Sequence, residues 1–139
     1  MSTNYYFCKR NQIKSIQEYN KEVLKNIDGN SLISREKMED FLNRCLFDTI
    51  SKKENHICKF SAGHRPSFQI NEHYKNIDEL IEYYYNNELD IYDEYLEQIS
   101  WGDLIGKINK SIEDNEEEPG NHLCFVDEKG LHWYMEYFS

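Results

Sequence analysis

The chain has 139 residues and a formal net charge of −10 at neutral pH, a length that favours one domain with its own hydrophobic core. Aromatic residues make up 14% of it, and eleven of them are tyrosines, so much of the buried surface must come from rings that keep a polar end. No apolar run approaches the roughly 20 residues that cross a bilayer, and the first ten residues lack the apolar part of a signal peptide. These features exclude a membrane span and predict a cytoplasmic protein.

Charge is distributed unevenly along the sequence. Residues 1–75 hold 13 basic and 9 acidic residues, whereas residues 76–106 hold 9 acidic residues and no Lys or Arg. The remaining residues, 107–139, hold 3 basic and 8 acidic residues. Such an acidic segment disfavours direct binding of nucleic acid and favours a negative face for a basic partner. The alternative is a solvated acidic surface that keeps a small protein soluble.

The first half of the chain predicts a strand followed by two helices. Residues 4–9 contain an apolar run typical of a strand that is buried on both faces. Asn11 is placed to cap a helix, and Gly29 to end it in a left-handed conformation. A second helix begins near Ser34, and its apolar stripe consists of Met38, Phe41, Leu42, Cys45, Leu46 and Ile50.

Residues 55–60 and 67–70 alternate between polar and apolar residues on either side of a turn at Ser61-Ala62-Gly63, which predicts a β-hairpin. Asn76 and Glu79 form a capping box that opens a third helix. A strand is expected over residues 88–92.

Ser100 and Asp103 form the capping box of a fourth helix. A charged loop follows at residues 114–121. A second hairpin is expected from residues 122–126 and 131–137, joined by the turn 127–130. Strands that alternate with helices and form hairpins predict an α+β domain over residues 1–139, in which a mostly antiparallel sheet carries helices packed on one side.

Cysteine and histidine suggest two kinds of chemistry. The four cysteines contain no CxxC pair, which favours free and mostly buried thiols. The pattern His-x-Cys occurs twice, and residues two apart on a strand point the same way, so two neighbouring strands would complete a tetrahedral zinc site. A Cys58 nucleophile next to His56 or His64 is the other option. The residues that would hold zinc are His56, Cys58, His122 and Cys124.

Two candidate binding sites remain. The first is an acidic and tyrosine-containing recognition surface, because Tyr and carboxylates form adaptable hydrogen bonds. It consists of Glu88, Asp90, Tyr92, Asp93, Glu94 and Glu97. The same carboxylates are also possible ligands of a divalent metal. The second site is an anion- or nucleotide-binding hairpin tip in which glycine lets main-chain N–H groups converge beside cations. Its residues are Lys59, Ser61, Gly63, His64 and Arg65.

Several fragments resemble a family of small, functionally unassigned bacteriophage proteins. They are Thr3-Asn4-Tyr5-Tyr6, the segment HICKFSAG at 56–63, IYDEY at 91–95, VDEKG at 126–130 and the closing EYFS. Members of that family are similar in carrying a GTNYY-like start, a HIGKSSAGW-like centre, an IYDEYG-like turn and a closing EFS. The match leaves out residues 11–54, which are interpreted as a helical insertion. The resemblance implies a phage origin and a role inside an infected bacterium.

The chain departs from that family at three places. The family often has a CxxC pair after its first strand, whereas only Cys8 stands there in this chain. Cys58 replaces a glycine, and His64 replaces an aromatic residue. These differences put a family-type zinc knuckle in doubt. They also change the side chains that would line a pocket at the central motif.

Three functions follow as hypotheses. The first is a non-enzymatic, anti-CRISPR-like inhibitor without a cofactor, whose acidic surface occupies a basic groove of a bacterial defence protein in the host cytoplasm. The second is a protein that sequesters a nucleotide second messenger at residues 59–65. The third is a Cys/His or metal-dependent enzyme. Neither a Walker-type GxxxxGK[ST] motif nor GxGxxG is present, so NTP hydrolysis and dinucleotide binding are not indicated.

Overall fold

A computed structural model describes residues 2–27, 34–116 and 123–138 of the chain. In this part the strands form one sheet of seven, in which only the β3–β7 pair is parallel. Across the sheet, the strands are β5 (Gln98–Ile99), β4 (Leu89–Asp93), β1 (Ser2–Lys9), β2 (His56–Ser61), β3 (Ser67–Gln69), β7 (His132–Tyr134) and β6 (Leu123–Val126). The predicted α+β fold with a mostly antiparallel sheet is confirmed.

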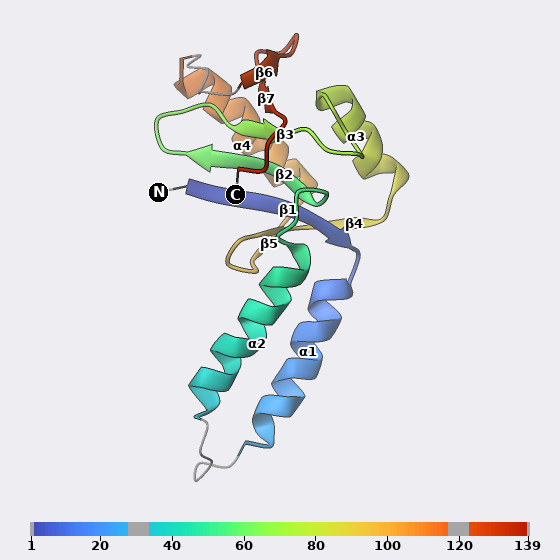
Figure 1. The fold of residues 1–139 in the computed structure, drawn as a ribbon, viewed down its shortest axis with the longest axis vertical. Coiled ribbons are helices and arrows are strands. Elements are labelled where there is room, and N and C mark those ends of the chain that lie inside the picture. The colour runs from blue at the N-terminus through green and yellow to red at the C-terminus, as the bar shows by residue number, and fades with distance from the viewer. Residues whose placement is uncertain (1, 28–33, 117–122, 139) are drawn as a thin grey trace.

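The described helices lie on two sides of this sheet. Helices α3 (Ile77–Asn86) and α4 (Trp101–Asp114) pack against one face, whereas α1 (Gln12–Lys25) and α2 (Arg35–Ile50) extend away from the sheet as an arm (Figure 1). This arm is the predicted helical pair. None of the helices in the described ranges combines the length and the apolar character that crossing a bilayer requires.

Two hydrophobic clusters stabilise the two faces. The larger joins β1, β3 and β7 to α3 and α4 through residues such as Phe7, Phe68 and Trp133. The smaller joins the base of the arm to the other face. Because β1 contributes to both clusters, it is buried on both sides, as its apolar run predicts. The smaller cluster consists of Tyr6, Cys8, Ile13, Leu46, Ile50 and Tyr92.

Three of the four predicted helix starts are confirmed by their caps. Ser34, Asn76 and Ser100 each accept a hydrogen bond from the main-chain N–H three residues later. Helix α1 begins directly after Asn11, as predicted, but the Asn11 side chain does not cap it. Asn11 has a φ of 64° and makes no side-chain cap, and its N–H donates to Asp90 Oδ2 over 2.8 Å instead. Gly29 lies outside the described residues.

The apolar stripe predicted for α2 is only partly buried. Cys45 is exposed and Phe41 is 54% exposed, so the prediction that they face the core is wrong. The reason is that α2 meets the sheet only through its last turns, where Leu46 and Ile50 are buried. The outer turns of the arm have no sheet beneath them (Figure 1).

The second predicted hairpin is present but shorter than expected. Its turn is closed by the Gly130 N–H, which donates to the Asp127 carbonyl over 3.0 Å. Strand β7 ends at Tyr134, and residues 135–138 leave the ladder to cross the sheet face. The loop predicted over residues 114–121 begins one residue later than expected, because α4 continues to Asp114. Most of this loop, and His122, lie outside the described residues.

Candidate binding surface

The His56–Cys58 pair does not share one side of β2. Tyr5 pairs with Cys58 and Tyr6 pairs with His56, so β2 advances by two residues while β1 advances by one. This β-bulge turns the two side chains to opposite faces. Cys58 belongs to the larger cluster, whereas the His56 ring lies against Tyr6, 5.1 Å between ring centroids. The prediction that both residues present ligands on the same side is therefore wrong.

Cys124, the other member of the predicted zinc site that the structure describes, lies far from His56 and Cys58. Cys124 is exposed on β6, and two strands separate β6 from β2. No group of three His, Cys, Asp or Glu side chains within the described ranges is arranged to hold a metal ion. Cys58 is completely buried, and this burial raises the pKa of its thiol far above the ordinary value. Cys58 is therefore neither accessible nor ionised as a nucleophile requires.

His56 is instead part of a buried polar network. Its Nδ1 lies 3.0 Å from Gln69 Oε1, and its Nε2 lies 2.9 Å from the Asn4 side chain. The Gln69 NH₂ group donates to main-chain carbonyls of residues 134, 135 and 136, and so fixes the C-terminal segment over the histidine. Burial lowers the pKa of His56 to about 4, so the ring is neutral at neutral pH.

This network determines the tautomer of His56. Because the amide nitrogen of Gln69 is used by carbonyls, its oxygen faces Nδ1, which must carry the proton. A neutral ring then accepts at Nε2, but the atom placed 2.9 Å from it is Asn4 Oδ1, which is also an acceptor. Rotating the Asn4 amide by about 180° brings its NH₂ group to Nε2 and satisfies both groups.

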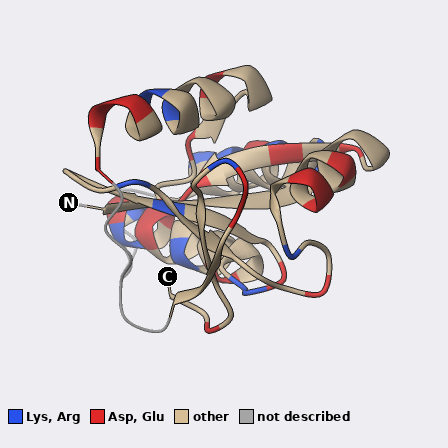
Figure 2. Ribbon diagram, turned by 90° about the horizontal axis from the view of Figure 1, so that it is seen from above, with Lys and Arg blue, Asp and Glu red and all other residues tan. Residues whose placement is uncertain are grey.

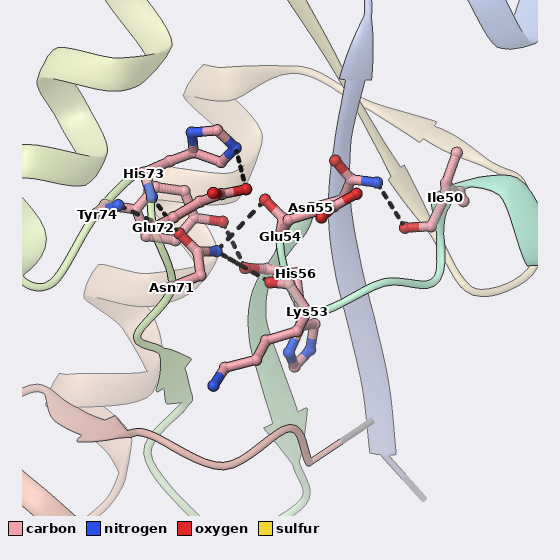
Figure 3. Close-up of polar contacts among 9 residues, drawn as sticks. All are labelled: Ile50, Lys53, Glu54, Asn55, His56, Asn71, Glu72, His73 and Tyr74. Carbon is pink, nitrogen blue, oxygen red and sulfur yellow. Dashed lines mark hydrogen bonds and ion pairs between the residues drawn. The ribbon is translucent and has the colours of Figure 1, made fainter.

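A second polar hub lies beside the start of β2 and is shown in Figure 3. The Asn71 NH₂ group donates to the Lys53 carbonyl over 3.0 Å, while its oxygen accepts from the N–H groups of His73 and Tyr74. The Tyr74 hydroxyl donates to the His56 carbonyl. The sequence analysis missed this hub, although an Asn three residues before a buried Tyr is a signal of side-chain-to-main-chain bonding. It fixes the loop that enters β2.

In the predicted anion-binding tip, the Arg65 side chain bonds to main-chain carbonyls of the protein itself. Gly63 has a φ of 78°, and the His64 N–H closes a turn onto the Ser61 carbonyl over 3.1 Å. The Arg65 guanidinium donates to the carbonyls of Asn115 and Gly130, and thereby ties α4 to the second hairpin. Lys59 lies half-buried on β2, opposite Asn4 of β1. An anion bound here would compete with carbonyl partners for the charge of Arg65.

The predicted acidic surface lies along β4 and the turn that leads to β5. We call its five carboxylates the acidic edge: Glu88, Asp90, Asp93, Glu94 and Glu97. The neighbouring helix α3 contains acidic residues but no Lys or Arg, whereas α4 contains both acidic and basic residues (Figure 2). Tyr92, which was predicted to join this surface, is 2% exposed and packs in the smaller cluster.

Three carboxylates of the acidic edge are held by main-chain N–H groups. Asp93 Oδ1 accepts from Tyr95 and Glu97, over 2.8 and 2.9 Å, and Glu94 accepts from Asn4 over 3.2 Å. Asp90 accepts from Asn11, as described above. Glu88 and Glu97 are exposed. Throughout the described residues, no Lys or Arg lies within 4.0 Å of these five carboxylates.

Comparisons with known proteins add no relative. The chain matches no protein-family model, no curated protein and no solved structure.

Proposed function

We propose that this protein is a non-enzymatic inhibitor that binds a bacterial antiviral defence protein. In this proposal the acidic edge occupies a basic groove of the partner that otherwise holds nucleic acid. The observation that supports it is the run of five carboxylates over β4 and its two flanks, none of which is paired with a Lys or Arg of the described chain. The phage setting rests on the resemblance given above.

The hydrogen bonds of the acidic edge are compatible with this role. A carboxylate has about four acceptor positions, and the main-chain N–H groups use only one or two on each of Asp90, Asp93 and Glu94. The remaining positions can accept from Arg or Lys of a partner. Because these carboxylates are already held in place, binding loses little side-chain entropy. Opposite charge also raises the association rate, and this contribution falls as salt rises.

The direct test is phage plating on bacteria that carry an antiviral defence system. Expression of the chain should raise the plating efficiency of a targeted phage. A Glu88→Lys/Glu97→Lys variant should lose this effect, because both side chains are exposed and make no hydrogen bond through their carboxylates among the described contacts. A matched Glu36→Lys/Asp48→Lys variant, with both changes at exposed positions of α2, should keep it. Equal protection by both variants, or none by the wild-type chain against any system in a broad panel, would reject the proposal.

A further inference from the structure

Three hollows adjoin Gln17 of α1, near the junction between the arm and the β4–β5 turn, and we refer to them together as the groove. These hollows, with volumes of 560, 280 and 300 Å³, all have Gln17 in their walls. The first and second also share Asn43, and the first and third share Leu96. The hollows therefore share walls: the first is lined mainly by α2 and the β4–β5 turn, the second by α1 and α2, and the third by α1 together with β4, the turn and β5.

The polar lining of this groove is rich in carboxamides with unused hydrogen-bonding capacity. Among the described contacts, no hydrogen bond is made by the side-chain amides of Gln17, Asn20, Asn43 or Gln98. The amides of Asn71 and Asn115, by contrast, bond to main-chain carbonyls. A carboxamide offers one acceptor and two donors, which is the complement of a peptide unit.

The wall formed by the turn is held in place before anything binds. Asp93 Oδ1 accepts from both Tyr95 and Glu97, and Leu96 has a φ of 63° that turns its side chain toward the smaller cluster. The Tyr95 ring remains 64% exposed at the mouth of the groove. Asp40 and Glu94 line the same hollow as this ring, together with one cation, Arg44. Two carboxylates beside an aromatic ring suit a guanidinium or ammonium group.

The charges of the lining disfavour nucleic acid as the ligand. The acidic residues that line the three hollows outnumber the basic ones, and a polyanion would have to approach them closely. The acidic residues are Glu18, Glu39, Asp40 and Glu94, and the basic residues are Lys14, Lys21 and Arg44.

We propose that this groove binds an extended peptide segment of the partner protein. The main chain of the segment bonds to the amides of Gln17 and Asn43, and an Arg or Lys side chain enters between Asp40 and Glu94 beside the Tyr95 ring. Glu94 belongs both to the groove and to the acidic edge, so the two surfaces are continuous. The inference rests on the proposed function, because it identifies how the partner is recognised.

The test uses a library of random linear dodecapeptides displayed on filamentous phage, selected on the purified full chain. Selected peptides should be rich in Arg or Lys. They should shift the side-chain NH₂ signals of Gln17 and Asn43 in ¹H–¹⁵N spectra. A Gln17→Leu/Asn43→Leu variant should bind them at least tenfold more weakly, whereas Asn109→Leu, at an exposed amide of α4, should bind them as the wild type does. The spectra also report whether each variant is folded.

Three results would overturn the inference: no enriched peptide, enriched peptides that bind the Gln17→Leu/Asn43→Leu variant equally well, or tighter binding of (dT)₁₂ in the groove. The plating assay separates this failure from failure of the proposed function. If Gln17→Leu/Asn43→Leu protects phage like the wild type while Glu88→Lys/Glu97→Lys does not, the groove is wrong and the inhibitor proposal stands. If peptides bind the groove but the wild-type chain protects no phage, the inhibitor proposal is wrong and peptide binding by the groove stands.

Discussion

Mild acid should destabilise this protein through His56, one of the two buried histidines among the described residues. The ring is 0% exposed, its nitrogens lie beside the neutral side chains of Asn4 and Gln69, and it packs against the rings of Tyr6, Tyr137 and Phe138. Burial is the main reason for its low pKa, and the nearby Lys59 lowers this pKa further. Protonation would place a charge among groups that cannot compensate for it.

The size of the effect follows from the two pKa values. His56 titrates near 6.5 in the unfolded chain and at about 4 in the folded one. The unfolded chain therefore binds the proton first, so this contribution to stability is complete above about pH 6.5 and is lost as the pH falls through 4. The linkage relation gives a loss of about 2 kcal/mol between pH 7 and pH 5, and about 3 kcal/mol in total below pH 4.

Urea unfolding measured between pH 7 and pH 5 tests this reasoning, since most carboxylates remain ionised over that range. His56→Gln is the matched variant, because its side-chain amide can donate to Gln69 and accept from Asn4 as the neutral imidazole does. We expect the variant to have a lower free energy of unfolding at pH 7 and a much smaller dependence on pH. If both proteins lose the same free energy between pH 7 and pH 5, His56 is not the group responsible.

Three further predictions concern other parts of the fold. Gln69→Ala should lower the free energy of unfolding by about 2–4 kcal/mol, because it removes the partners of several buried groups, and it should speed hydrogen exchange in residues 135–138 relative to the rest of the chain. In the native protein, Ellman's reagent should react quickly with two thiols only, and with the others after unfolding; the fast pair is Cys45 and Cys124, the slow pair Cys8 and Cys58. Gly130→Ala should cost more than about 1 kcal/mol in a thermal or urea melt, since φ is 78° and the new Cβ would lie 3.0 Å from Arg65 Nη1; an unchanged melt would mean that the turn relaxes freely.

Local patterns predicted most of the secondary structure because each depends on neighbours in the sequence. The caps at Ser34, Asn76 and Ser100 require only a side chain and an N–H three residues away, and the Asp127–Gly130 turn is equally local. The apolar run of β1 likewise predicted a strand buried on both faces.

Features that depend on distant residues were predicted poorly. The bulge that separates His56 from Cys58 arises from the pairing of β2 with β1, some 50 residues away, and period-two alternation does not reveal it. The burial of α2 depends on how far the arm extends beyond the sheet, which left Phe41 exposed. Arg65 looked like an anion ligand because its carbonyl partners, Asn115 and Gly130, lie 50 and 65 residues later.

The candidate site shows the same division. Composition identified the acidic segment, and the structure places its carboxylates on β4 and beside it, with Asp90 and Asp93 on opposite faces of the sheet. Composition did not show that Tyr92 faces the core, because β4 is covered on both faces: Ile91 packs in the larger cluster and Tyr92 in the smaller one. The groove around Gln17 was not predicted, because its walls come from α1, α2 and the β4–β5 turn.

The most direct measurement is the binding of this chain to a defence protein that it inhibits, followed in real time at several salt concentrations. We expect the association rate to fall as salt rises. Glu88→Lys/Glu97→Lys should weaken binding at least tenfold, whereas Glu36→Lys/Asp48→Lys should leave it unchanged. Association that is independent of salt, together with equal affinities of the two variants, would contradict the role of the acidic edge.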